Sequence, residues 1–382
     1  MQNPLAIVEE IMNSFAYRTG LSSDLKPRRY LWTDAFAVCN FLELYRKGFG
    51  EKYRNLALKL VDQVHFILGR HRDDDVRKGW ISGLNDEEGF KHPTIGGLRI
   101  GKPLPERKPD EPLDEYIEWE RDGQYYHYLT RWMHTLNRVY LTIGNPIYNL
   151  WAVELAKTAH RAFVYTGADG RKRIYWKMSI DLSRPLVASM GSHDPLDGFT
   201  VYCELQAYSP DNPLWPNLSE EIEEIKDILL DVDLVTGDPL SIGSLLWDAY
   251  ILAKLTSQGL VDCIDILLDV LDAALVGMEL YLADGWPPLS SSRFAFRELG
   301  LSIGLKAVDR LVELIGKPSF PRYSDIHHIL ESLRYYTKLA ERIDRYWLDS
   351  MIRESYTWRK YEDINMVMLA TSLAPDEFLG VY

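Results

Sequence analysis

Histidine and aspartate side chains gather in one short stretch, MGSHDPLDGF, at residues 190–199. His193, Asp194 and Asp197 surround Pro195, and carboxyl and imidazole groups of this kind can move protons near neutral pH. The same residues are typical of a helix start, because an aspartate before a proline caps backbone N–H groups. An acid three residues later completes a capping box. Three further Asn-Pro or Asp-Pro pairs, beginning at residues 3, 145 and 238, also precede helical patterns. Capping and catalysis therefore both remain open for Asp194 and Asp197.

A second group of titratable residues lies in YYHYLTRWMHTLNR, residues 125–138. His127, Arg131, His134 and Arg138 recur at i, i+4, i+7 and i+11, which places them on one face of a helix. Such a face is either a solvated outer surface or the lining of a cavity. In a cavity, Arg131 would bind a negatively charged group and His127 would transfer protons, with Trp132 as a stacking surface.

Asp34 stands in LWTDAFAVCNFLEL, the most apolar helical pattern of the chain. A buried carboxylate needs a partner, or its pKa rises. The sequence predicts either a structural contact with Arg28 or Arg29, or an acid or base that faces a pocket. Further substrate-binding candidates near predicted helix starts are Trp32, Trp247, Asp248, Arg297, Trp358 and Arg359.

Helical periodicity dominates the chain and predicts about twelve helices joined mostly by short breaks. The predicted helices cover residues 4–17, 30–47, 51–70, 115–142, 146–164, 195–208, 219–230, 239–256, 261–282, 292–314, 326–353 and 361–373. Two β-prone runs within residues 162–180 flank Asp169-Gly170 and predict one small β-hairpin. Residues 73–112 form a long irregular insertion, typical of a lid or rim loop.

Helices that are apolar nearly all round alternate with amphipathic helices along the sequence. This pattern predicts an all-α fold, a single (α/α)6-barrel domain over residues 1–382, with inner helices wrapped by outer ones. The inner helices are expected to start near residues 30, 125, 195, 239, 293 and 361. Loops that lead into inner helices would then meet at one end of a central cavity. An open solenoid of helix pairs is the competing arrangement.

Charge and composition exclude several classes of function. The net charge of −13 opposes binding to nucleic acid or to anionic membrane surfaces. No apolar stretch is long enough to span a membrane, the first residues lack signal-peptide features, and three separated cysteines indicate buried free thiols. These features predict a soluble cytoplasmic protein. Since nucleotide and metal motifs are lacking, we expect no cofactor and no metal; the oligomeric state stays open.

The segments YLWTDAF, YYHYLTRWMH and GSHDPLDGF, each leading into a predicted inner helix, resemble the six-hairpin glycosidase superfamily and the sugar 2-epimerases that share its barrel. The resemblance implies a saccharide, or another small polar substrate, in a central cavity. The first hypothesis is a glycoside hydrolase with paired carboxyl groups. Its candidate acids are Asp34, Asp194, Asp197 and Asp248, with Trp32, Trp132 and Trp358 for stacking.

Two other hypotheses remain beside the hydrolase. A sugar epimerase would use His127 and His193 as its proton-transfer pair, with Arg131 polarising a carbonyl oxygen. A helical ring without catalysis would serve as a binding scaffold.

Overall fold

The computed structural model describes residues 3–283, 285–286, 293–316 and 320–381, which are mainly helical. The chain divides into two compact units, one made of Ala16–Val232 and the other of Met1–Phe15 with Asp233–Tyr382. The assignment of residues 1–382 to a single domain stays a prediction beside this division.

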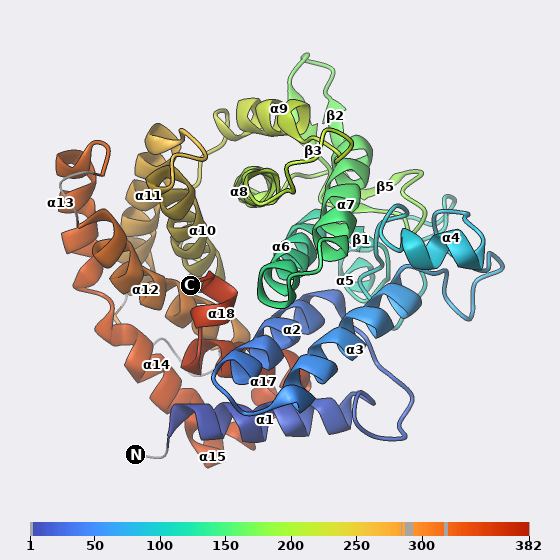
Figure 1. Cartoon of the computed structure of the whole chain (residues 1–382), viewed down its shortest axis with the longest axis horizontal. Helices are drawn as coiled ribbons and strands as arrows, with labels where there is room; N and C mark the ends of the chain where they lie inside the picture. The colour runs from blue at the N-terminus through green and yellow to red at the C-terminus, as the bar shows by residue number, and fades with distance from the viewer. Residues whose placement is uncertain (1–2, 284, 287–292, 317–319, 382) are drawn as a thin grey trace. The chain divides into compact units, whose positions relative to one another are not determined.

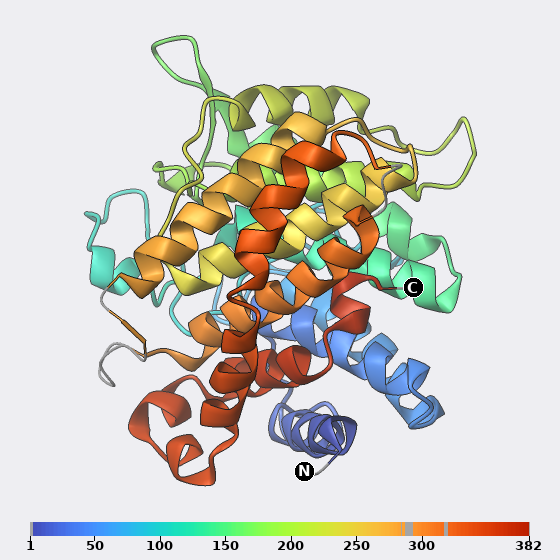
Figure 2. The ribbon, with the colours of Figure 1, turned by 90° about the vertical axis from the view of Figure 1, so that its left-hand side faces the viewer.

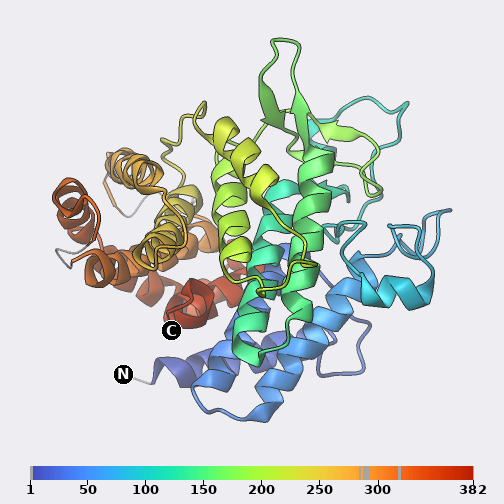
Figure 3. The ribbon, with the colours of Figure 1, turned by 45° about the horizontal axis from the view of Figure 1, so that its top comes forward.

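The unit Ala16–Val232 is built from three pairs of long helices (Figures 1 and 3). The pairs are α2 (Leu31–Arg46) with α3 (Glu51–Leu68), α6 (Tyr126–Ile143) with α7 (Ile147–Phe163), and α8 (Asp194–Ala207) with α9 (Ser219–Leu229). Within this unit α6 packs against both α2 and α8, while α3, α7 and α9 each cover one of the three. Every residue of α2 from Leu31 to Leu44 is buried, as expected of a helix that is apolar all round.

Short elements complete this unit. The predicted hairpin is confirmed: β2 (Val164–Thr166) pairs antiparallel with β3 (Lys172–Ile174), and Gly170 in the turn has a φ of +79°. A three-stranded sheet that the sequence did not predict joins β1 (Gln124–Tyr125), β4 (Lys177–Met178) and β5 (Pro185–Val187) in the order β1-β4-β5. Residues 73–112 are largely irregular as expected, but they contain α4 (Asp86–Lys91), and α5 (Glu115–Glu118) follows them.

The other unit is helical in its described residues (Figure 2). Its elements are α1 (Pro4–Arg18, as far as Phe15), α10 (Pro239–Ser257), α11 (Ile264–Leu282), α12 (Ala295–Ile315), α13 (Tyr323–Arg334), α14 (Lys338–Leu348), α15 (Ser350–Arg353), α16 (Tyr356–Lys360), α17 (Glu362–Leu373) and α18 (Asp376–Leu379). Helix α10 packs against α11 and α12, and α12 also contacts α13, α14 and α17.

Helices α10 and α12 cross at glycines. A Cβ atom added to Gly304 would lie 2.5 Å from the carbonyl oxygen of Gly243, and one added to Gly243 would collide with the carbonyl oxygen of Gly300. The two backbones therefore touch directly at this crossing. The spacing of Gly300 and Gly304 indicates such a close approach, since both fall on one face of a helix.

The six expected inner helices α2, α6, α8, α10, α12 and α17 begin within two residues of the predicted positions. Two predicted helices are wrong in extent. The run 115–142 is interrupted because Gly123, with a φ of +153°, and the extended strand β1 separate α5 from α6. The run 326–353 is divided into α13, α14 and α15, and the side chain of Asp349 caps the last of these by accepting the N–H of Met351. The described part of α12 begins at Ala295, and residue 292 lies outside the described residues.

All three cysteines are buried thiols, as predicted. Over the stretches of chain that the structure describes, none of the helices combines the length and the apolar character that crossing a membrane requires. The cytoplasmic location stays a prediction.

The interior of the first unit contains a histidine held by two tryptophans. His65 of α3 accepts a hydrogen bond at Nε2 from the indole N–H of Trp132 (3.1 Å), and Trp151 lies edge-on at 5.0 Å. Trp132 has no exposed surface, so this predicted stacking residue belongs to the interior in the structure. Burial lowers the pKa of His65 to about 3.

We expect His65 to make the fold acid-sensitive. Because its pKa is lowered in the folded state, its stabilising contribution is present above about pH 6.5 and is lost as the pH falls toward 3. Between pH 7.5 and 4.5, wild type should lose about 3 kcal/mol more free energy of unfolding than His65→Gln. The glutamine keeps an acceptor for Trp132 but does not titrate. Urea unfolding at the two pH values measures this difference, and equal losses would contradict it.

Candidate active site

Three helix starts in the unit Ala16–Val232 bring together residues that the sequence singled out. Trp32 lies at the start of α2, His127 and Arg131 in the first turns of α6, and Asp194 with Asp197 in the first turn of α8. The rings of Trp32 and His127 are 6.1 Å apart, and His127 Nδ1 is 3.6 Å from Asp194 Oδ1. Five residues distant in sequence therefore form one cluster.

Asp194 is the first residue of α8 and not its N-cap residue. The N-cap residue is His193, whose side chain makes no capping hydrogen bond. At the other three Asn-Pro or Asp-Pro pairs, the side chains of Asn3, Asn145 and Asp238 do accept helix N–H groups. The sequence pattern is thus the same at four places. At the fourth, the carboxyl group of Asp194 lies beside His127.

The surroundings of Asp194 favour the protonated form of its carboxyl group. Burial, together with the charge of Asp197, raises the pKa of Asp194 well above its usual range, against a smaller opposite effect of the Gly191 backbone. A Cβ atom on Gly191 would lie 2.8 Å from both carboxyl oxygens, so only glycine leaves room for this group. Burial also lowers the pKa of His127 to about 4, which makes the imidazole neutral at pH 7.

Asp194 Oδ2 and His127 Nδ1 are buried polar atoms of this cluster that lack a hydrogen-bond partner among the described residues. Since buried polar atoms are almost always paired, both atoms are suited to bind the polar groups of a ligand.

The second carboxyl group of the cluster has a cationic partner. Asp197 Oδ1 accepts a hydrogen bond from Arg131 at 3.3 Å, and the guanidinium lies 5.7 Å from the ring centroid of Trp32. A carboxyl group with a raised pKa and an arginine-paired carboxylate, one helix turn apart, suit the division of roles that acid–base catalysis requires.

An aromatic wall surrounds His127. Its ring lies nearly parallel to Tyr125 (5.3 Å, 24°) and Trp176 (6.3 Å, 16°) and edge-on to Tyr128 (4.8 Å). The hydroxyl of Tyr128 is 2.8 Å from that of Tyr30, at the N-cap of α2. Sequence analysis did not select these four residues. The tyrosines beside His127 were visible in the segment YYHY, but Trp176 follows some fifty residues later and only the fold places it there.

Asp34 makes the structural contact with Arg29 that was one of the two alternatives predicted from the sequence. Its carboxylate accepts hydrogen bonds from the Arg29 guanidinium (3.4 Å) and from the backbone N–H of Tyr30 (2.9 Å), and it is buried. Asp34 therefore fixes the first turn of α2, which carries Trp32. His193, half-buried, directly precedes Asp194.

The polar stripe of α6 is not a solvated outer face. Arg131, His134 and Arg138 are buried, and His127 is partly exposed at the start of the helix. His134 Nδ1 lies 2.7 Å from Glu204 of α8. The stripe therefore lies in the interior of its unit, where Arg131 pairs with Asp197 and His134 with Glu204.

The remaining predicted substrate-binding residues belong to the other unit. Trp247 is fully buried and packs edge-on against Phe378, and Asp248 is buried and accepts a hydrogen bond from Ser244 (3.3 Å). In the same unit, Arg297 pairs with Asp238, Trp358 stacks on Trp347 (6.0 Å), and Arg359 is exposed. Their predicted role in binding stays a prediction.

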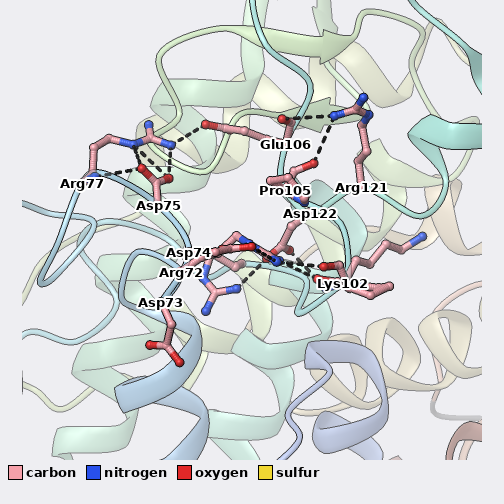
Figure 4. A network of polar contacts seen from close by, with 12 residues as sticks. Arg72, Asp73, Asp74, Asp75, Arg77, Lys102, Pro105, Glu106, Arg121 and Asp122 are labelled. Carbon is pink, nitrogen blue, oxygen red and sulfur yellow. Dashed lines mark hydrogen bonds and ion pairs between the residues drawn. The ribbon is translucent and has the colours of Figure 1, made fainter.

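The insertion is fastened to its unit by ion pairs, which Figure 4 shows. Arg77 binds Asp75, Glu106 (2.5 Å) and Asp181 (2.8 Å). Asp122, fully buried, accepts hydrogen bonds from Arg99 (2.5 Å) and Arg72 (3.3 Å).

Asp122 also accepts the backbone N–H groups of Gly101, Lys102 and Gly123. Because Gly123 immediately precedes β1 and α6, Asp122 ties the insertion to the helix that carries His127.

A search for metal-binding clusters was limited to the described ranges. In these ranges no group of three or more His, Cys, Asp or Glu side chains is arranged to hold a metal ion.

Comparison with known proteins shows similarity in structure. No family model matches the chain, and no curated protein matches its sequence. The GH76 alpha-1,6-mannanase from Salegentibacter sp. HEL1_6 aligns with a TM-score of 0.53 at 11% identity, over 97% of this chain and 99% of that chain. The GH76 alpha-mannanase from Bacteroides thetaiotaomicron aligns with a TM-score of 0.56 at 9% identity, over 99% and 98%.

An inactive variant of the Salegentibacter enzyme, with two consecutive aspartates changed to asparagine, has been solved in complex with alpha-1,6-mannotriose. It aligns with a TM-score of 0.53 at 12% identity, over 97% of this chain and 99% of that chain. Identities this low show a shared fold. The chain thus has the (α/α)6-barrel fold of these two enzymes, as the sequence predicted.

Proposed function

We propose that this protein is a carbohydrate-active enzyme, and specifically a glycoside hydrolase. The observation that carries the proposal is the pair Asp194 and Asp197. Burial and the neighbour's charge raise the pKa of the Asp194 carboxyl group, and the Asp197 carboxylate is paired with Arg131. Glycosidic cleavage requires such a pair, an acid for the leaving oxygen and a carboxylate for the sugar carbon or for water.

In the proposed mechanism Asp194 donates its proton to the glycosidic oxygen. Its Oδ2 atom has no hydrogen-bond partner among the described side chains, so no other group competes for that proton. Asp197 acts as the nucleophile or as the base that activates water, and Arg131 stabilises its charge before the reaction. The partly exposed rings of Tyr128 and Trp176 provide stacking surfaces for sugar rings, and the buried Trp32 packs against Tyr128.

A second candidate function is sugar epimerisation. The observation that favours it is the neutral His127, whose Nδ1 is buried and has no hydrogen-bond partner in the described part of the chain. A neutral imidazole can abstract a proton next to a carbonyl group, and His193 would return it from the other side.

The proposal rests on this chain's own side chains. In the mannanase variant that is inactive, the two changed aspartates are consecutive, whereas Asp194 and Asp197 are three residues apart. The roles of Asp194 and Asp197 are therefore argued from their own contacts. The ligand of that complex, alpha-1,6-mannotriose, is a first substrate for assays.

We expect the wild-type protein to cleave oligosaccharides. Alpha-1,6-mannotriose, the ligand of the mannanase complex, is the first substrate to incubate in deuterated water, followed by di- and trisaccharides of glucose and galactose. Mass spectrometry should detect shorter products with new reducing ends and without carbon-bound deuterium. Carbon-bound deuterium in an uncleaved sugar would replace the hydrolase with the epimerase, and binding without turnover of any sugar would support a scaffold.

A further inference from the structure

We propose that Trp119 and Lys102 form an outer saccharide-binding position, which holds a sugar ring beyond those at the candidate active site. The saccharide class rests on the proposed function. The binding position itself follows from contacts within the unit Ala16–Val232.

Trp119 presents its ring to solvent from a fixed backbone. The residue is 50% exposed, although it adjoins the buried Glu118. Lys177 donates hydrogen bonds to the backbone oxygen and to Oε1 of Glu118, both at 2.8 Å, and Lys102 donates one to the backbone oxygen of Trp119. An exposed aromatic ring whose backbone is already held loses little conformational entropy on binding.

The ring of Trp119 continues the aromatic wall of the candidate site. It lies edge-on to Trp176 at 5.0 Å, and Trp176 in turn lies 5.3 Å from Tyr125 and 6.3 Å from His127. His127 contacts Asp194. A saccharide chain of two or three rings can therefore follow one aromatic surface from the proposed acid to Trp119.

Lys102 supplies polar donors beside this surface. Its Nζ atom lies 5.4 Å from the ring centroid of Trp119 and 5.6 Å from that of Tyr125. An ammonium group has three donors, so those beyond the bond to the Trp119 oxygen can bind sugar hydroxyls. The backbone of Lys102 is held by Asp122, which fixes the donor at the end of the insertion. This contact gives the irregular insertion a role in substrate binding.

Charge argues against a second copy of this chain as the occupant. Leu113, Tyr116 and Ile117 are also exposed near Trp119, as at many protein interfaces. Acidic residues Glu115 and Glu120 flank the same segment, and the net charge of −13 opposes self-association. A neutral, polar ligand with apolar ring faces suits a tryptophan beside a lysine.

The test compares Trp119→Ala with Tyr116→Ala, a matched change at a tyrosine that is 90% exposed on α5. Calorimetric titration uses di- and trisaccharides of mannose, glucose and galactose, and turnover is measured with those that are cleaved. For a trisaccharide we expect Trp119→Ala to raise Kd, and KM where turnover occurs, by about tenfold, which corresponds to about 1.4 kcal/mol. Disaccharide binding and the Tyr116 variant should not change. Lys102→Met should weaken trisaccharide binding in the same selective way.

Each result decides between the two proposals. Trisaccharide binding that depends on Trp119 without any cleavage keeps the outer position and removes the hydrolase. Cleavage with equal Kd values in wild type and Trp119→Ala removes the outer position and keeps the hydrolase. A wild-type protein that binds no member of the panel overturns the outer position. A concentration-dependent dimer in sedimentation analysis that Trp119→Ala abolishes overturns it in favour of an interface between copies.

Discussion

Asp194→Asn should lower the turnover number of the cleavage reaction by about 10²–10⁴-fold, the usual contribution of a general acid. Asparagine has nearly the shape of the protonated carboxyl group but has no acidic proton to donate. The variant should still bind saccharide, because the aromatic wall around His127 is unchanged. Turnover and Kd measured on the same substrate separate these two effects.

The free energy of unfolding of Asp194→Asn distinguishes a loss of turnover from unfolding of the variant. The folded-state pKa of Asp194 is raised, so its contribution to stability is present below the unfolded pKa, near 4, and is lost as the pH rises through the raised value. At neutral pH the variant should therefore be at least as stable as wild type. The wild-type rate should fall on the alkaline side as Asp194 ionises. Asp211→Asn, at an exposed aspartate, is the matched control, and full activity of Asp194→Asn would remove the assignment of the acid.

Asp122→Ala should lower the free energy of unfolding by about 3–5 kcal/mol, the usual effect of breaking a buried ion pair from one side. The change removes the acceptor for Arg99 and Arg72 and for three backbone N–H groups, and it leaves both arginines without this counter-charge. Since Asp122 also holds Lys102 and the chain before β1, saccharide binding should weaken as well.

Urea unfolding followed by tryptophan fluorescence measures the loss at Asp122. Asp110→Ala, an exposed aspartate of the same insertion, is the control and should lie within about 0.5 kcal/mol of wild type. A loss for Asp122→Ala no larger than that of the control would show that the insertion is held by other contacts.

Much of the fold can be predicted from periodicity, because the inner helices are apolar all round and this pattern depends on burial alone. The positions of α2, α8 and α10 follow from it directly. The sheet of β1, β4 and β5 could not be predicted, since its strands are only two or three residues long and have no pattern of their own. Likewise, the break before α6 could not be predicted. The chain is held there by Asp122, which accepts hydrogen bonds from Arg72 and Arg99, and these arginines lie much earlier in the sequence.

The site could be predicted in part for a similar reason. His127, Arg131, Asp194 and Asp197 were recognisable by residue type and by their place at helix starts. The sequence could not decide whether Asp194 caps its helix, because the alternatives differ only in the direction of one side chain. Trp176 lies between β3 and β4, Trp119 at the end of α5 and Lys102 in the insertion, and only the folded chain brings them near His127.

The glycine crossing of α10 and α12 has a consequence for evolution. Where backbone meets backbone, no substitution at Gly243 or Gly304 can be accommodated by a shift of a neighbouring side chain. Homologues that retain this helix pair must therefore retain these two glycines, even after most other positions have diverged. Their spacing offers a signature by which distant members of the lineage can be aligned.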